Sequence, residues 1–206
     1  YDASLKPDLL TYALDNQTSE RFTSGGMVFN IAGTKLYALS QTGKLFCFAV
    51  PAGGPVGGAA TRASACAGWS DYSAGTTVSY STAWPVYDGL GAVTTIYFGD
   101  DSGKLHKVNG STGASSWSGG GGTIASTSAS ALASPVVVTD TATLKDVVYV
   151  GDTKGRFFRY IDTGTTPTAG SASSYDLCGG GPGSCSSNPW GVYTSPSIDL
   201  TYSKAY

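Results

Sequence analysis

The chain has 206 residues, of which 13% are charged, and its formal net charge is −2. Its 12 basic residues are scattered along the sequence, whereas binding to nucleic acid requires clustered Lys and Arg that neutralise phosphates. No stretch approaches the roughly 18 consecutive apolar residues of a membrane-spanning helix. We therefore expect neither nucleic acid nor a membrane span.

Three stretches of the chain follow one pattern in one order. Residues 34–47 (TKLYALSQTGKLFC), 95–106 (TIYFGDDSGKLH) and 146–158 (DVVYVGDTKGRFF) each contain an alternating apolar run, a turn ending in Gly and a second run. A repeat of about fifty residues with two strands and a tight turn is typical of a β-propeller blade. The sequence therefore predicts an all-β protein.

The positions inside the repeat agree from one copy to the next. Tyr37, Tyr97 and Tyr149 occupy the same place, and a turn glycine follows each tyrosine by six positions. Glycine suits such turns because it adopts positive φ at no steric cost. A meander of hairpins without radial packing is the alternative interpretation.

Each blade is expected to contain four antiparallel strands. In the third copy we predict strands at residues 136–139, 147–151 and 156–161, and an outer strand before Cys178. The dipeptides Trp84-Pro85, Ser134-Pro135 and Ser195-Pro196 are expected to open the innermost strands, because proline at the first residue of a strand loses no ladder hydrogen bond.

The repeat divides the chain into full and partial blades. We predict the end of a preceding blade at residues 1–24, full blades at 25–75, 76–124 and 125–190, and the first strand of a further blade at 191–206. Three full and two partial blades cannot close a ring, and open edges expose unpaired strands. The expected partner is therefore the remaining blades of the same protein or another protein chain, and a monomer of these residues alone would contradict this.

The four cysteines lie around loops that burial alone would hold poorly. Cys47 and Cys66 flank an insertion rich in Gly, Ala and Pro, and Cys178 and Cys185 flank a glycine-rich segment. Local pairing closes loops of about 20 and 8 residues, worth roughly 3.3 and 2.5 kcal/mol. Other pairings, free thiols and zinc remain alternatives. Disulfides favour an oxidising compartment, so we expect an extracellular or cell-surface protein.

A docking motif gives the sequence a family resemblance. Asn109, Thr112, Gly113 and Trp117 follow the spacing of the motif that joins blades in quinoprotein-like β-propellers, with Asn in place of the usual Asp. Asp15 belongs to a weaker second copy, and the third blade has only a shortened copy at residues 162–164. The resemblance implies a propeller whose blades dock through these residues.

Tryptophan is suited to covering a neighbouring blade, since its ring buries a large area and its N–H finds an acceptor. Trp117 is the first docking candidate and Trp69 the second, although an ordinary core tryptophan predicts nearly the same packing. Residues 135–160 also resemble a blade in the propeller domain of type IV pilus tip adhesins. The spacer at 141–145 lacks the aspartates that bind calcium in that group, so no metal site is expected.

The inventory of catalytic side chains is small. His106 is the only histidine, and on a third strand its side chain is expected to be exposed rather than to act as a general base. Asp100 and Asp101 lie in a tight turn, where aspartate accepts backbone hydrogen bonds. Glu20 is the sole glutamate. We predict no catalytic residue and no cofactor.

The resemblance also implies an alternative function. The quinoprotein family includes dehydrogenases that hold pyrroloquinoline quinone and calcium on the propeller axis, with adjacent cysteines or a charged cluster around the quinone. No two cysteines are adjacent here. The chain could still be part of a quinoprotein-type oxidoreductase whose active site lies in other blades, or of a larger surface enzyme.

The leading expectation is a secreted, non-catalytic propeller segment that serves binding, adhesion or assembly at the cell surface, as part of a pilus or filament. Long insertions at residues 51–67 and 165–189 place function on loops carried by a rigid scaffold. Self-assembly and a surface glycan are the two expected modes of partnership, and self-association without a glycan distinguishes them.

Overall fold

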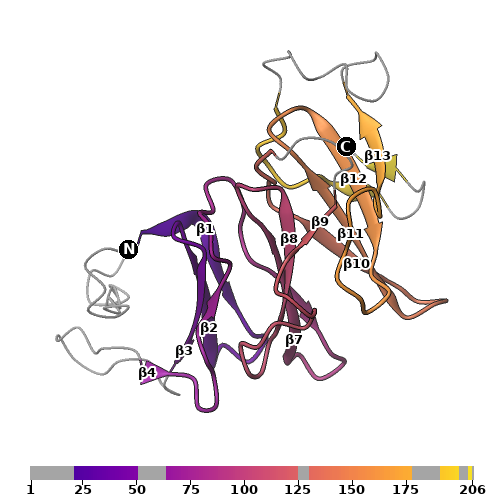
Figure 1. The fold of residues 1–206 in the computed structure, drawn as a ribbon. Coiled ribbons are helices and arrows are strands. Elements are labelled where there is room, and N and C mark those ends of the chain that lie inside the picture. The colour runs from indigo at the N-terminus through magenta and orange to yellow at the C-terminus, as the bar shows by residue number, and fades with distance from the viewer. Residues whose placement is uncertain (1–20, 51–63, 125–129, 178–190, 200–203, 206) are drawn as a thin grey trace, which may run out of the picture.

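The computed structural model describes residues 21–50, 64–124, 130–177, 191–199 and 204–205 (Figure 1). These residues form strands, turns and loops, and none of them is helical. Accordingly, no described segment is a helix with the length and hydropathy of a membrane span. The docking candidate Asp15 and the cysteines Cys178 and Cys185 lie outside the described residues.

The strands form three antiparallel sheets in chain order, followed by a short hairpin. The first sheet contains β1 (Phe22–Phe29), β2 (Lys35–Ser40), β3 (Lys44–Ala49), β4 (Ser64–Ala65) and β5 (Tyr72–Ser73). The second contains β6 (Trp84–Tyr87), β7 (Val93–Gly99), β8 (Lys104–Asn109) and β9 (Gly122–Thr123). The third contains β10 (Val136–Asp140), β11 (Lys145–Gly151), β12 (Arg156–Ile161) and β13 (Ser173–Asp176), and the hairpin pairs β14 (Ile198–Asp199) with β15 (Lys204–Ala205).

Each sheet is a meander, so the prediction of four-stranded antiparallel sheets is confirmed. In the first sheet two short strands, β4 and β5, pair with opposite ends of β3 and together take the place of the fourth strand. Strand β1 begins at Phe22, inside residues 1–24, which the sequence pattern places at the end of a preceding blade. Residues 191–206 contain two paired strands where one was expected.

The repeat is visible in the register of the central hairpins. Tyr37 pairs with Cys47, Tyr97 with Lys107 and Tyr149 with Arg159, each at the same position of its hairpin. The turn glycine Gly43 has φ of +78°, and a Cβ there would lie 2.0 Å from the carbonyl oxygen of Thr76. Any other residue at this position would therefore be both strained and blocked.

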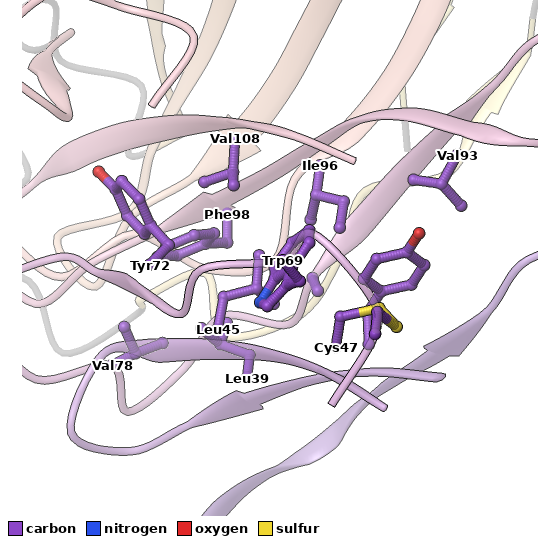
Figure 2. Close-up of a cluster of buried hydrophobic side chains, with 13 residues drawn as sticks. Leu39, Leu45, Cys47, Trp69, Tyr72, Val78, Val93, Ile96, Phe98 and Val108 are labelled. Atoms are coloured by element: carbon purple, nitrogen blue, oxygen red, sulfur yellow. A yellow bond between two sulfur atoms is a disulfide. The ribbon is translucent and has the colours of Figure 1, made fainter. Parts of the chain in front are cut away.

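The sheets stack one against the next, as Figure 1 shows from indigo through magenta to orange. One buried cluster joins the first and second sheets around Trp69 (Figure 2), and another joins the second and third around Trp117. A third cluster, with Leu36 and Phe46, lies on the other face of the first sheet. The central strands of the first and second sheets are thus largely buried on both faces, whereas burial alternates along β12 of the third sheet, and the described sheets form no closed ring.

Candidate functional site

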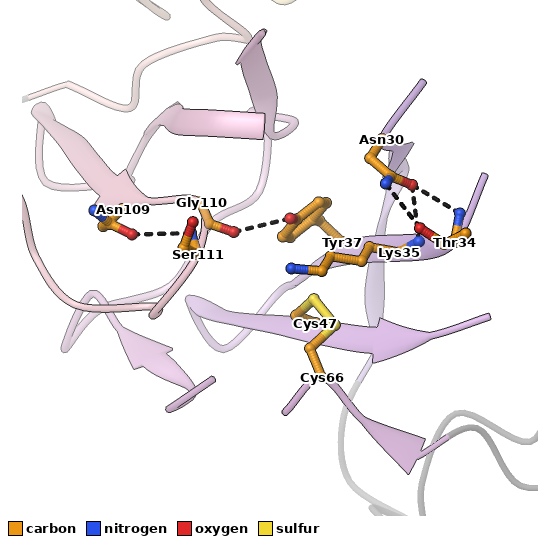
Figure 3. Close-up of a disulfide and its surroundings, with 9 residues drawn as sticks. All are labelled: Asn30, Thr34, Lys35, Tyr37, Cys47, Cys66, Asn109, Gly110 and Ser111. Atoms are coloured by element: carbon orange, nitrogen blue, oxygen red, sulfur yellow. Dashed lines mark hydrogen bonds between the residues drawn. A yellow bond between two sulfur atoms is a disulfide. The ribbon is translucent and has the colours of Figure 1, made fainter. Parts of the chain in front are cut away.

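A disulfide joins Cys47 and Cys66 in the first sheet (Figure 3). Cys47 lies on β3 and Cys66 follows β4, with their Cα atoms 5.4 Å apart. Both belong to the buried cluster between the first and second sheets. The bond therefore ties the end of a long insertion to the core of the stack.

The loop after β8 carries the residues of the predicted docking motif. The Asn109 side-chain oxygen accepts the backbone N–H groups of Ser111 and Thr112, at 2.9 and 3.0 Å. The carbonyl of Thr112 accepts the N–H of Ser70 from the first sheet. Gly113 has φ of +76°, and a Cβ there would lie 1.9 Å from the Ser70 carbonyl oxygen. This loop therefore packs backbone to backbone against the preceding sheet.

Trp69 and Tyr37 form the aromatic centre of the first interface between sheets. Their rings meet edge to face, with centroids 5.6 Å apart. The Tyr37 hydroxyl donates to the carbonyl of Gly110 in the second sheet at 2.8 Å (Figure 3). The Trp69 indole nitrogen is buried and has no hydrogen-bond partner among the described residues. Burial, and to a smaller extent Tyr87, raises the pKa of Tyr37 to about 12.

Trp117 and Tyr97 repeat this pair at the second interface, with ring centroids 6.0 Å apart. Here the acceptor is the buried carboxylate of Asp162 in the third sheet. It accepts the Tyr97 hydroxyl at 2.6 Å and the Trp117 indole N–H at 3.4 Å, and it pairs with the Lys107 ammonium at 2.6 Å. The Asp146 carboxylate also lies 2.9 Å from the Tyr97 hydroxyl and shares its single proton with Asp162.

The charges at this second interface are mutually stabilised. Burial opposes ionisation of Asp162, yet hydrogen bonds from Lys107 and Tyr97 outweigh it and hold the pKa of this carboxyl below its usual value. Burial and the two adjacent carboxylates raise the pKa of Tyr97 far above its ordinary range. The tyrosine therefore stays a neutral donor to an ionised acceptor.

The prediction of an exposed His106 was wrong, because only 1% of its surface is accessible. Its Nε2 lies 2.8 Å from Asp100, its Nδ1 lies 2.8 Å from the Tyr72 hydroxyl, and its ring stacks on Phe98. Alternation along a strand marks two faces, but here both faces are covered by neighbouring sheets. His106 is thus a packing residue of the first interface and has no access to a substrate.

Asp100 and Asp152 shape the turns that follow β7 and β11. Asp100 accepts the N–H groups of Ser102 and Lys104, as the sequence predicts, and Asp152 accepts those of Lys154 and Arg156. Burial raises the pKa of Asp100, but the hydrogen bonds from His106 and Lys104 outweigh it and lower the pKa overall. The Asp100 carboxylate is therefore held ionised inside the second sheet.

A pocket of about 310 Å³ lies where the first strands of the sheets begin. It is lined by Thr23, residues 79–82, Ser134 and residues 193–195, so four separate segments converge on it. All nine lining residues are Ser, Thr or Tyr, and none is charged. Sequence reasoning missed this site, because hydroxyl residues are common throughout the chain and only the stacking brings these nine together.

The lining does not fit the cofactor that the family resemblance implies. An anionic quinone held with calcium requires cationic side chains and several carboxylate or carbonyl oxygens, whereas the side chains that line this pocket include neither a cation nor a carboxylate among the described residues. Elsewhere in the described part of the chain, no group of three or more His, Cys, Asp or Glu side chains could hold a metal ion.

Comparisons with known proteins do not place the chain in a family. No known protein family matches the sequence, and no curated protein matches it. A solved structure with some similarity is the crystal structure of the computationally designed Ika8 protein, at a TM-score of 0.42 and 12% identity. The similarity covers 84% of this chain and 52% of that one. A likeness at this level assigns neither fold nor function.

Proposed function

We propose that the chain is a section of a β-propeller that acts outside the cell as a non-catalytic binding and assembly module. The stacking of three sheets in chain order and the common register of their tyrosine hairpins support the propeller. The convergence of their first strands on one pocket supports a shared axis. The disulfide at Cys47 and Cys66 supports an oxidising compartment.

The observation that carries this proposal is that the buried ionisable side chains of the sheets are bonded to other side chains. Besides tyrosines, the core of the described residues holds five ionisable side chains, and each is bonded to another side chain: Asp100, His106, Asp152, Arg156 and Asp162. A catalytic acid, base or nucleophile needs contact with its substrate. Groups that bond to one another within and between the sheets stabilise a scaffold instead, and we expect the exposed pocket and loops to bind the ligand.

Surface labelling of intact cells that produce the protein tests this proposal. A membrane-impermeant amine reagent should label the protein before lysis, while a cytoplasmic protein of the same cells stays unlabelled. Cys47 and Cys66 should react with a thiol reagent only after reduction. Labelling only after lysis, with both thiols reactive from the start, would contradict an exterior role.

The non-catalytic part of the proposal has a separate test. The purified protein, supplied with pyrroloquinoline quinone, calcium and a panel of alcohols and sugars, should reduce no artificial electron acceptor. Reduction above a heat-denatured control would favour the oxidoreductase alternative. Sedimentation without added glycan then distinguishes assembly, which gives species larger than one chain, from ligand binding by a single chain.

A further inference from the structure

The pocket at the start of the first strands has the chemistry of a neutral, hydroxyl-rich ligand. A Ser, Thr or Tyr hydroxyl both donates and accepts hydrogen bonds. A lining of nine such residues therefore suits a ligand that itself carries hydrogen-bond donors and acceptors. An anion or cation would lose its hydration without gaining a counter-charge among the lining side chains, which is costly. The lining therefore selects against charged ligands.

Some of the lining hydroxyls are held in place by hydrogen bonds to other residues of the protein. The Ser81 hydroxyl accepts the N–H of Gly99 at 2.8 Å, and the Ser134 hydroxyl accepts that of Thr82 at 2.9 Å. The Ser79 hydroxyl donates to the Asp101 carboxylate at 2.7 Å. These bonds join residues from separate segments of the chain, so this wall is positioned before a ligand arrives.

The other lining hydroxyls remain available to a ligand. The side-chain oxygens of Thr82, Tyr193, Thr194 and Ser195 make no hydrogen bond to another described residue, and neither does that of Tyr80. The pocket thus combines a prepositioned wall with hydroxyls that a bound molecule can engage. Such a division is typical of small-molecule sites, where a few polar groups fix orientation.

Two tyrosines give the pocket an apolar side. Tyr80 and Tyr193 are 44% and 49% exposed, and their rings meet edge to face with centroids 5.2 Å apart. A pyranose ring carries hydroxyls around its edge and C–H groups on its faces, so it matches hydroxyls and an aromatic surface together. The volume of about 310 Å³ lies at the lower end of the range for small-molecule sites and suits one sugar residue.

We propose that this pocket binds one neutral pyranose, free or as the terminal residue of a glycan. This assignment rests on the proposed exterior binding role and names its ligand class. Tyr193 and Tyr80 pack against the C–H face of the sugar, and the hydroxyls of Thr194 and Ser195 bond to its edge.

Ligand-observed NMR on the full chain tests this assignment. The probes are the methyl glycosides of glucose, galactose, mannose and N-acetylglucosamine, with glucuronic acid and N-acetylneuraminic acid as charged counterparts. At least one neutral glycoside should bind, and neither acid should compete with it. Immobilised oligosaccharides that end in the same sugar distinguish a glycan terminus from a free sugar.

Two variants connect the binding to the pocket. Tyr193→Ala should weaken binding by roughly tenfold, since an aromatic contact and its buried area are lost. The matched control is Tyr175→Ala on β13, because Tyr175 is 57% exposed and does not line the pocket. Its affinity should equal that of the unaltered protein. Tyr193→Phe, which keeps the ring, should lose less than Tyr193→Ala and guards against misfolding.

Three results would overturn the assignment. They are binding of the sugar acids alone, equal loss of affinity in the Tyr193 and Tyr175 variants, and no binding of any neutral sugar by the folded protein. If no sugar binds while intact cells still display the protein, only the ligand class fails. If the protein is found inside the cell, the proposed function fails regardless of sugar binding.

Discussion

The two interfaces between neighbouring sheets use the same aromatic pair but different acceptors. Tyr37 meets Trp69 at the first interface and donates to a backbone carbonyl, whereas Tyr97 meets Trp117 at the second and donates to carboxylates. The difference traces to one equivalent position, which Gly110 occupies in the second sheet and Asp162 in the third. The equivalence is visible in the backbone. The N–H of Gly110 donates to the carbonyl of Thr94 in the second sheet, and the N–H of Asp162 donates to the carbonyl of Asp146 in the third.

This difference shows that the docking tyrosine and the docking acceptor are independent features. The tyrosine position is repeated in each hairpin, so the sequence pattern reveals it. The acceptor need only present an oxygen at the right place, and glycine supplies one through its backbone. A carboxylate makes a stronger bond to a hydroxyl than a carbonyl does, since it is charged. We therefore expect the second interface to depend more on its polar contacts.

The largest expected effect comes from removing a docking tryptophan. Trp117→Ala should lower the free energy of unfolding by about 3–5 kcal/mol, because the ring is 2% exposed and would leave a large cavity. Urea unfolding measures this loss. Trp117→Phe should also cost more than Trp69→Phe, since only Trp117 loses a hydrogen bond. An unchanged melting temperature for Trp117→Ala would place that ring outside the core.

Removing the disulfide should weaken the first interface and spare the second. The double substitution Cys47→Ala and Cys66→Ala should cost about 3 kcal/mol in the chain-entropy account. Amide exchange should rise in β3, which carries Cys47, and in its neighbour β2 more than in β11 and β12. Equal acceleration in all four strands would mean that the two interfaces unfold as one unit.

The matched tyrosine substitutions compare the acceptors directly. Tyr97→Phe removes a hydroxyl proton shared between two buried carboxylates and should cost about 2–4 kcal/mol, whereas Tyr37→Phe removes one bond to a carbonyl and should cost about 1 kcal/mol. Chemical unfolding of the two variants side by side provides the measurement. A larger loss for Tyr37→Phe would reverse the proposed ranking of the interfaces.

Different residues should limit the stability of the fold at acid pH and at alkaline pH. The pKa values of Asp100 and Asp162 are lowered, so their stabilisation is complete above the unfolded value of about 3.9 and is lost as the pH falls below it. The pKa values of Tyr37 and Tyr97 are raised. The stabilisation that these two tyrosines contribute is therefore complete below about pH 10 and is lost as the pH rises further. Asp162→Asn should reduce the acid limb, and Tyr97→Phe the alkaline limb, in unfolding measured across this range.

The sequence predicts the sheets better than it predicts the contacts between them. Strand β12 begins and ends as expected because apolar alternation and a turn glycine mark it. The burial of His106 is not predictable from one strand, since it depends on a second sheet covering the other face. Asp162 and the pocket depend on residues far apart in the chain, and no local pattern brings these together.

A double-mutant cycle between Tyr97→Phe and Asp162→Ala tests the stacked architecture most directly, because the two residues meet only if the second and third sheets dock as described. We predict a coupling free energy of about 1.5–3 kcal/mol for this pair. The control cycle of Tyr37→Phe with Asp162→Ala should be additive, since these residues belong to different interfaces. Additivity of the Tyr97 and Asp162 substitutions as well would contradict the docking of one sheet on the next.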